Sequence, residues 1–244
     1  MSLQPKPYLR EVRFRDTSGL DVTRYPWSIP AVRDIDRLDF HPDVTFFVGE
    51  NGSGKSTILE AIAVALGYAA EGGTKNARFQ TVESVSSLHR DLKLVRSFAK
   101  PADGYFLRAE SLFNLATYMD EIGSLQPSLH DRSHGEAFMQ ILRDKLQGNG
   151  LYLLDEPEAA LSPTRQLAAL VIIDQLVRKH SQFIIATHSP ILLAYPNARI
   201  LRFDDSGISE VNYEDTEHYT VTRDFLNHYP GRLARLLADD EGSQ

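Results

Sequence analysis

The chain has 244 residues, with a hydrophobic content of 42%, a charged content of 24% and a formal net charge of −7 at pH 7. These values are typical of a globular protein, and the acidic balance argues against a surface built for nonspecific nucleic-acid binding. The absence of cysteine excludes disulfides, thiolate metal sites and cysteine nucleophiles. No apolar run reaches the ~20 residues of a membrane-spanning helix, and the N-terminal stretch has no signal-peptide core, so we expect a cytoplasmic protein without membrane insertion.

The first predicted elements are two short strands. Tyr8–Phe14 alternates apolar and charged residues, as a half-buried strand does, and a second candidate covers Arg37–Phe40. Two strands ahead of a buried parallel core would form an antiparallel flap.

The most informative stretch runs from Val44 to Thr57. Val44–Val48 is apolar or β-branched and predicts a strand covered on both faces, and a helix is expected from Ser56 to about Leu66, with Gly67 at its end. Between them lies Gly-x-x-x-x-Gly-Lys-Ser, the Walker A pattern, whose backbone N–H groups cradle the phosphates of a nucleoside triphosphate. The predicted nucleotide-binding residues are Gly49, Glu50, Asn51, Gly52, Ser53, Gly54, Lys55, Ser56 and Thr57.

Two side chains of this loop have specific tasks. Lys55 would reach the β- and γ-phosphates, and the Ser56 hydroxyl would take a place on Mg²⁺. A chance match in a glycine-rich loop is the alternative, which the strand before and the helix after disfavour.

Upstream, Tyr25 or Arg13 could stack on the nucleotide base. The alternative is a packed ring for Tyr25 and a solvated guanidinium for Arg13.

No single period persists over the next stretch. The predicted elements are a strand near Arg78–Val82, a helix near Ser86–Leu92, a strand at Tyr105–Ala109 and a helix at Leu112–Ile122. Gln80 could sense Mg²⁺ or the attacking water, and a glutamine that only faces solvent fits the sequence equally well.

Five cations against two anions between Arg78 and Lys100 give a local charge of +3. These cations could contact nucleic-acid phosphates or be merely solvated.

Ser133-His134-Gly135-Glu136 precedes an apolar stripe and predicts a helix start. Ser133 and Glu136 match the capping box, in which each side chain bonds to the backbone N–H of the other residue. Such a helix N-terminus can also hold a phosphate that a neighbouring molecule presents. The two interpretations are compatible.

A second buried strand, Leu151–Asp155, ends in two adjacent carboxylates, Asp155 and Glu156. Carboxylates at the carboxyl end of a strand belong in the crevice where an α/β sheet binds its ligand. Asp155 would hold Mg²⁺, directly or through water, and Glu156 would orient and deprotonate the attacking water. An ordinary exit from a strand into a turn is the alternative.

The remaining chain contains one more candidate site residue. Ser162-Pro163 predicts the start of a helix through Lys179, with a stripe of Leu167, Leu170, Val171, Asp174 and Val177. Gln182–Thr187 is a third buried strand, followed by His188, which can reach the γ-phosphate or be a satisfied core histidine. A hairpin over Arg199–Phe203 and Ile208–Tyr213, helices near Val221–His228 and Arg232–Asp239, and an acidic tail complete the prediction.

In their order, these motifs resemble the ABC-type ATPases. The similarity is greatest to the compact branch grouped with RecF and SMC proteins, and to a family of small stand-alone bacterial predicted ATPases that shares the runs Tyr152–Pro163 and Gln182–Pro196. The resemblance covers nearly the whole chain and implies an α/β P-loop fold in a single ATPase domain. The nucleotide-binding core would comprise residues 1–75 and 148–244, with an inserted lid or signature subdomain over about 76–147.

The resemblance also implies a composite site between two subunits paired head to tail. Ser133 and Gly135 would act in trans on the ATP of the partner, and His188 would be a switch histidine acting with Lys55 and Glu156 in catalysis. His134 and Glu136 replace a glycine and the glutamine of the transporter signature Leu-Ser-Gly-Gly-Gln, and Ser162 replaces the D-loop aspartate. Glu136 would repel a triphosphate unless its carboxylate caps its own helix.

The implied activity is Mg²⁺-dependent ATP hydrolysis that drives an ATP-gated homodimer switch, linked to DNA repair or defence. ATP and Mg²⁺ are the implied cofactors, and nucleic acid and an unidentified protein are further candidate partners. One alternative is the ATPase subunit of an ABC transporter. A small-molecule or nucleoside kinase would need an acceptor site and no switch histidine.

Overall fold

The structure is a computed structural model that describes residues 6–14, 21–33, 35–74, 86–110 and 133–238. Gln80, the strand predicted near Arg78–Val82 and the helix predicted at Leu112–Ile122 lie outside these residues. The acidic tail after Ala238 lies outside them as well.

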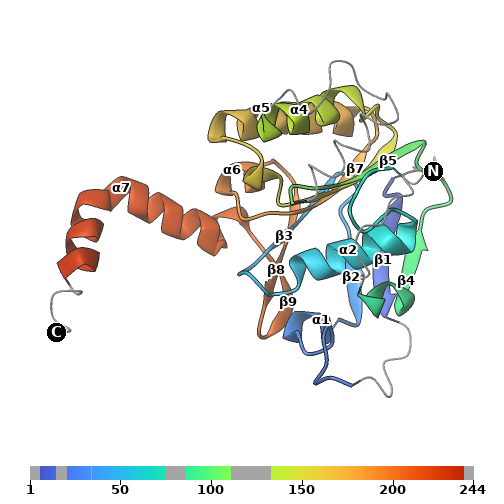
Figure 1. Cartoon of the computed structure of the whole chain (residues 1–244), viewed down its shortest axis with the longest axis horizontal. Helices are drawn as coiled ribbons and strands as arrows, with labels where there is room; N and C mark the ends of the chain where they lie inside the picture. The colour runs from blue at the N-terminus through green and yellow to red at the C-terminus, as the bar shows by residue number, and fades with distance from the viewer. Residues whose placement is uncertain (1–5, 15–20, 34, 75–85, 111–132, 239–244) are drawn as a thin grey trace.

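A six-stranded sheet with the order β5-β6-β7-β3-β8-β9 forms the centre of the molecule (Figure 1). Its strands are β3 (Val44–Val48), β5 (Asp103–Arg108), β6 (Gly150–Asp155), β7 (Gln182–Ala186), β8 (Arg199–Asp204) and β9 (Gly207–Val211). All neighbouring pairs are parallel except β8 and β9, which form the predicted hairpin. The expected α/β fold with buried parallel strands is confirmed.

Both faces of this sheet are covered, which explains why every residue of β3, β6 and β7 is buried. Side chains of neighbouring residues alternate between the faces, so Phe46 and Phe47 belong to different cores. The core around Phe46 includes residues of α4 (His134–Asp144), α5 (Pro163–Arg178) and α6 (Pro190–Leu193). The core around Phe47 includes α2 (Lys55–Leu66) and a second sheet.

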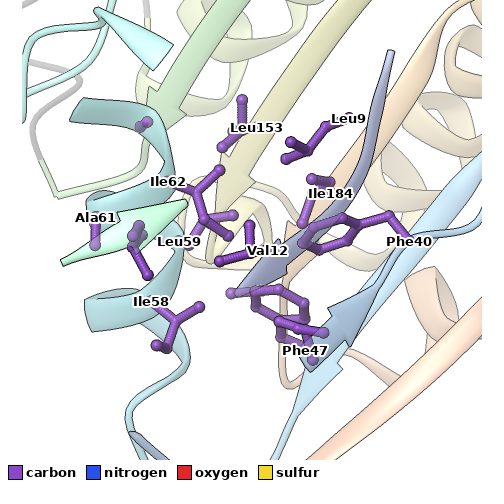
Figure 2. Packing of buried hydrophobic residues seen from close by; sticks show 14 of the residues in the cluster. Leu9, Val12, Phe40, Phe47, Ile58, Leu59, Ala61, Ile62, Leu153 and Ile184 are labelled. Atoms are coloured by element: carbon purple, nitrogen blue, oxygen red, sulfur yellow. The ribbon is translucent and has the colours of Figure 1, made fainter. Parts of the chain in front are cut away.

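The second sheet is antiparallel and has the strand order β2-β1-β4. Its strands are β1 (Leu9–Phe14), β2 (Arg37–Asp39) and β4 (Leu92–Arg96), and α1 (Pro30–Arg33) precedes β2 in the chain. Figure 2 shows Leu9 and Val12 of β1 packed among α2 residues and the core-sheet residues Leu153 and Ile184. The predicted flap is therefore present and covers the face of the core sheet on which α2 lies.

The third strand of the flap was not predicted. Instead of a helix over Ser86–Leu92, the chain makes one 3₁₀ turn, η1 (Ser87–Arg90), and Leu92 begins β4. The predicted helix is shortened to this single turn because Leu92 already pairs with Phe14 of β1, and such long-range pairing leaves no local period.

The predicted insert, residues 76–147, contributes to both sheets where the structure describes it. β4 joins the flap, β5 pairs with β6 in the core sheet, and α4 supplies Phe138 to the core. The boundaries of a separate subdomain stay a prediction.

The stripe predicted for α5 was wrong by about one residue. Its buried residues are Gln166, Ala169, Ile173 and Leu176, whereas Leu167 and Val171 are 56% and 57% exposed. Gln166 faces inward because its amide donates to the Leu161 carbonyl at 2.9 Å and accepts from the Ser189 hydroxyl at 2.6 Å. Ser162 precedes Pro163 as expected, but its side chain makes no capping hydrogen bond.

At the carboxyl end, the two predicted helices form one kinked helix, α7 (Glu217–Ala238). Pro230 lies inside it, and His228 leaves the helical region with φ −129° and ψ 19°, as a proline without an N–H requires of the preceding turn. No residue of α7 is buried, and the helix extends away from the body of the molecule (Figure 1). Its exposed large apolar residues are Val221, Phe225, Leu226, Tyr229, Leu233, Leu236 and Leu237.

We predict that Gly49→Ala destabilises the fold. Gly49 has φ +145°, and a Cβ there would lie 2.3 Å from the backbone oxygen of Phe203. The free energy of unfolding should fall by about 2–4 kcal/mol in chemical denaturation, because the backbone of β8 would have to move. As a control, Gly231→Ala in α7 meets no atom within 4 Å and should change stability by less than about 1 kcal/mol. Equal stabilities for the two variants would contradict the close approach.

Candidate functional site

The phosphate loop lies between the end of β3 and the start of α2, as predicted. Lys55 is buried at 3% exposure, and its ammonium donates hydrogen bonds of 2.8 Å to the carbonyls of Gly49 and Glu50. Burial lowers the pKa of Lys55, an effect opposed by the neighbouring carboxylates of Glu156 and Asp155. The loop thus holds a cation at the point where backbone N–H groups and the start of α2 favour an anion.

Ser56 and Asp155 meet across the sheet edge. The Ser56 hydroxyl donates to Asp155 Oδ1 at 2.9 Å, and the Asp155 side chain is nearly buried. Burial raises the pKa of Asp155 to about 6, although the Arg108 guanidinium and the Ser56 hydrogen bond act in the opposite direction. Arg108 Nε lies 3.3 Å from Asp155 Oδ2, and its Nη1 bonds to Glu60 at 2.6 Å.

The oxygens of Ser56 and Asp155 fit a Mg²⁺ ion, which prefers hard oxygen ligands. Among the described residues, no group of three or more histidine, aspartate or glutamate side chains could hold a metal by itself. In nucleotide sites, Mg²⁺ takes one or two protein oxygens and completes its coordination with phosphates and water.

Glu156 directly follows β6 in a left-handed conformation, with φ 48° and ψ 51°. Its N–H donates to the carbonyl of Ala186 at 2.9 Å, so the backbone is fixed to β7 while the carboxylate is 36% exposed. A left-handed non-glycine residue costs about 1 kcal/mol or more and persists only when the surroundings fix it. Glu156 is therefore a constrained, accessible carboxylate at the site edge.

Glu158 is a site residue that the sequence reasoning missed. It accepts a 2.6 Å hydrogen bond from the Thr187 hydroxyl on one carboxylate oxygen and one from the His188 backbone N–H on the other. Burial raises its pKa, and these hydrogen bonds oppose the rise. Both oxygens of Glu158 hold the segment that follows β7. The third acidic residue in Asp155-Glu156-Pro157-Glu158 was the available signal.

His188 faces the site with one ring nitrogen and α7 with the other. Its Nε2 lies 3.7 Å from Glu156 Oε1, is inaccessible to solvent, and has no hydrogen-bond partner among the described residues. Its Nδ1 lies 3.0 Å from Nε2 of His218. His218, in the first turn of α7, was also missed, because a separation of 30 positions between the two histidines leaves no local pattern.

The predicted signature residues form a separate cluster. The capping box is confirmed: Glu136 N–H donates to the Ser133 hydroxyl, and Ser133 N–H donates to Glu136 Oε2 at 3.0 Å. Arg165 lies 3.2 Å from Glu136 Oε1 and donates to the Ser133 hydroxyl at 3.3 Å. The Glu136 carboxylate therefore caps its own helix, as the sequence predicts.

Gly135 has a structural reason to be glycine. A Cβ at this position would lie 2.4 Å from Arg165 Nη1 and 2.7 Å from the carbonyl oxygen of Ala160. Gly135 lets the start of α4 approach the segment that leads to α5. Ser133, one residue before the helix, is exposed.

Two hollows border the phosphate loop. The larger, of about 500 Å³, lies between the loop, the end of β8 and the start of α7, and it is lined by Pro30, Val48, Gly49, Glu50, Asn51, Gly52, Ser53, Arg202, Phe203, Asp204, Asp205, Thr216, Glu217 and His218. The second, of about 480 Å³, contains Glu50 and Asn51 together with His188, His218 and further α7 residues. The first turn of α7 thus borders the site.

The two base-stacking candidates differ in their surroundings. Tyr25 is 63% exposed, and its hydroxyl lies 3.2 Å from Thr57 Oγ1 at the start of α2. Arg13 pairs with Glu11 at 2.5 Å in the flap. Tyr25 is therefore an exposed ring beside the phosphate loop and not the packed aromatic that was the alternative.

Comparison with known proteins gives two family matches that span the residues of this site. A family model described as "AAA domain" matches residues 28–141, which include the phosphate loop. A second, described as "AAA domain, putative AbiEii toxin, Type IV TA system", matches residues 137–194, which include Asp155, Glu156 and His188. Over residues 28–194 the chain is therefore similar to P-loop ATPases of the AAA-domain families. No match to a curated protein was found for the ATPase.

Solved structures similar to the ATPase include two bacterial proteins. The SMC head domain from Thermotoga maritima is 14% identical, with a TM-score of 0.46, and the match covers 84% of this chain and 98% of that one. The cbiO1 protein from Clostridium perfringens, part of the ABC transporter complex cbiONQ, is 17% identical, with a TM-score of 0.45 and coverage of 83% and 90%. Within the described residues of the ATPase, no helix has the length and apolar character needed to cross a membrane.

We predict that Asp155→Asn stabilises the nucleotide-free ATPase in a pH-dependent way. The folded state raises the pKa of Asp155 from 3.8 to about 6, so it favours the protonated acid. The stability that this group contributes is complete below pH ~4 and is lost as the pH rises through ~6. Asparagine avoids this loss, and it should raise the free energy of unfolding by about 1–3 kcal/mol at pH 7.5.

Chemical denaturation at pH 7.5 and pH 4 tests this prediction. The advantage of Asp155→Asn should disappear at the lower pH. Asp144→Asn, which changes an exposed carboxylate at the end of α4, is the matched control and should show no such pH dependence. An equal advantage of Asp155→Asn at both pH values would contradict the prediction.

Proposed function

We propose that this ATPase is a Mg²⁺-dependent switch in which ATP closes a head-to-tail dimer and hydrolysis reopens it. The observation that carries the proposal is the division of the candidate residues into two clusters. Lys55, Asp155, Glu156 and His188 surround the phosphate loop. Ser133 lies at another exposed helix start, and its side-chain hydrogen bonds among the described residues go to Glu136 and Arg165.

In this proposal, the first cluster performs the chemistry. Lys55 would exchange its two loop carbonyls for phosphate oxygens, and Ser56 with Asp155 would hold Mg²⁺, which neutralises phosphate charge when bound. Glu156 would accept a proton from water as the water oxygen bonds to the γ-phosphorus. The bond from this phosphorus to the β–γ bridging oxygen breaks, giving ADP and phosphate. His188 Nε2 would contact the γ-phosphoryl group.

The second cluster would complete the site of a neighbouring copy. The negative charge of Glu136 is offset by Arg165 and by the N–H groups at the start of α4, so a phosphate could approach Ser133 without meeting an isolated carboxylate. A symmetric pair of copies contains two such composite sites. This arrangement supports an ATP-dependent homodimer.

The link to DNA repair or defence belongs to the proposal as well. Arg90, Lys93, Arg96 and Lys100 are all exposed, on β4 or beside it, so their charges are available to phosphate groups of a nucleic acid. This observation favours a nucleic-acid partner over the transporter role.

We predict that Glu156→Gln keeps ATP binding and slows hydrolysis ~10²–10⁴-fold, because the general base is lost while the shape is retained. With ATP and Mg²⁺, this variant should elute as a dimer in size-exclusion chromatography coupled to light scattering. Glu210→Gln makes the same change on the remote strand β9 and should hydrolyse ATP like the wild type. A Glu156→Gln variant that stays monomeric with ATP would refute the ATP-closed dimer.

A mixing experiment tests whether Ser133 acts in trans. Lys55→Ala and Ser133→Tyr should each abolish turnover, because every composite site then lacks one half. An equimolar mixture forms heterodimers in half of the pairs, each with one intact site of two, so about a quarter of wild-type activity should return. A mixture as inactive as its components would place both residues in the site of one chain.

A further inference from the structure

The contact between His188 and His218 restricts which atom of His188 can carry the ring proton. The distance of 3.0 Å between His188 Nδ1 and His218 Nε2 is that of a hydrogen bond, so one nitrogen donates and the other accepts. Their rings lie 5.1 Å apart between centroids at an angle of 53°. Since a neutral imidazole has one N–H, the direction of this bond decides the tautomer of His188.

The two directions have different consequences on the far side of His188. If His188 Nδ1 donates, its Nε2 carries a lone pair facing Glu156 Oε1, 3.7 Å away, and cannot donate to a phosphate. If His218 Nε2 donates, His188 carries its proton on Nε2, facing the Glu156 carboxylate. The second direction is favoured because it avoids two opposed acceptors in a partly buried site.

We infer that His218 is a positioning residue that sets the tautomer of His188, so that His188 presents an Nε2–H donor to the γ-phosphate. The role of the donor rests on the proposed ATP hydrolysis, whereas the tautomer rests on the contact with His218 and on the Glu156 carboxylate that faces Nε2. Among the described residues, His188 Nε2 has no hydrogen-bond partner, and it is inaccessible to solvent. It is the atom that carries the proton in this arrangement and can donate it to a ligand.

The surroundings keep both rings in place and neutral. Glu158 holds the His188 backbone N–H, and the Thr216 carbonyl accepts the N–H of Thr220 at 3.0 Å, in the first turn of the helix that carries His218. Burial lowers the pKa of each histidine and the positive charge of Lys55 acts in the same direction, whereas Glu156 opposes the shift at His188 and Glu217 and Glu158 oppose it at His218. A pair of neutral rings can share only one proton across the 3.0 Å contact.

The test compares two substitutions of His218. His218→Leu removes the donor, whereas His218→Gln can donate from its amide nitrogen. For His218→Leu we expect kcat to fall about 10-fold with KM for ATP within about 2-fold, because one positioning hydrogen bond is lost. His218→Gln should recover most of this loss. His228→Leu, an exposed histidine of the same helix, is the control and should leave kcat unchanged.

A second readout reports on the tautomer itself. In the nucleotide-free protein labelled with ¹⁵N-histidine, ring ¹⁵N chemical shifts should show His188 protonated on Nε2, with assignment from a His188→Asn variant. In His218→Leu, the shifts should move toward a mixture of the two tautomers. A wild-type spectrum with the proton on Nδ1, or a His218→Leu spectrum without change, would overturn the inference.

The experiment separates this inference from the proposed function. If Glu156→Gln does not lower turnover, the hydrolysis mechanism fails, although the ¹⁵N shifts still decide the tautomer. If Glu156→Gln abolishes turnover but His218→Leu changes neither kcat nor the His188 shifts, only the role of His218 fails. If His218→Gln is as impaired as His218→Leu in kcat while the shifts of both resemble the wild type, His218 has a different role.

Discussion

The adjacent parallel strands β6, β7 and β3 are the constraint on which the site depends. Their register places Asp155 opposite Ala186 and Ala186 opposite Phe47, so the three strands end at one edge. Two hydrogen bonds continue the ladder past the strand ends: Glu156 N–H donates to Ala186, and Thr187 N–H donates to Phe47. The loops that carry Glu156, His188 and the glycine-rich segment after β3 therefore leave the sheet in a fixed relation.

This edge concentrates charge that a stable core would avoid. Lys55 and Asp155 are both nearly buried, and the shifts in their pKa values have burial as the largest cause. Buried charges are costly unless they are paired and hydrogen-bonded, which is the role of Arg108, Ser56 and the loop carbonyls here. The folded state accepts this cost at a place where a triphosphate and a metal ion would supply the missing counter-charges.

Local sequence was sufficient to predict features that depend on neighbours in the chain. The buried strands, the glycine-rich loop and the Ser133–Glu136 capping box each have a short signature, and the structure contains them. Contacts between distant residues were not predictable in the same way. β4 is a strand because it pairs with β1, and the buried face of α5 is decided by Gln166, whose partners include Ser189.

The residues of the candidate site divide in the same way, into those with a local sequence signature and those that depend on distant contacts. Walker A, Asp155 and His188 could be recognised from residue type and position after a strand. Arg108 and His218 could not, since each acts through a residue that only the folded chain brings close. For Glu158, the acidic run was a signal, but its partners Thr187 and His188 are also brought close only by folding. His218 is the extreme case, because the helix that carries it looks from its sequence like an ordinary amphipathic end of the chain.

The way α7 extends from the body of the molecule determines how far its residues would move if its first turn tilted. Its first turn borders the phosphate loop, and the rest buries no residue and extends from the body (Figure 1). From Glu217 to the kink at His228 the helix is roughly 17 Å long at 1.5 Å per residue, so a tilt of about 10° at the first turn moves the kink by about 3 Å. A displacement of His218 too small to repack the core would therefore be amplified along α7 before the helix reaches its kink.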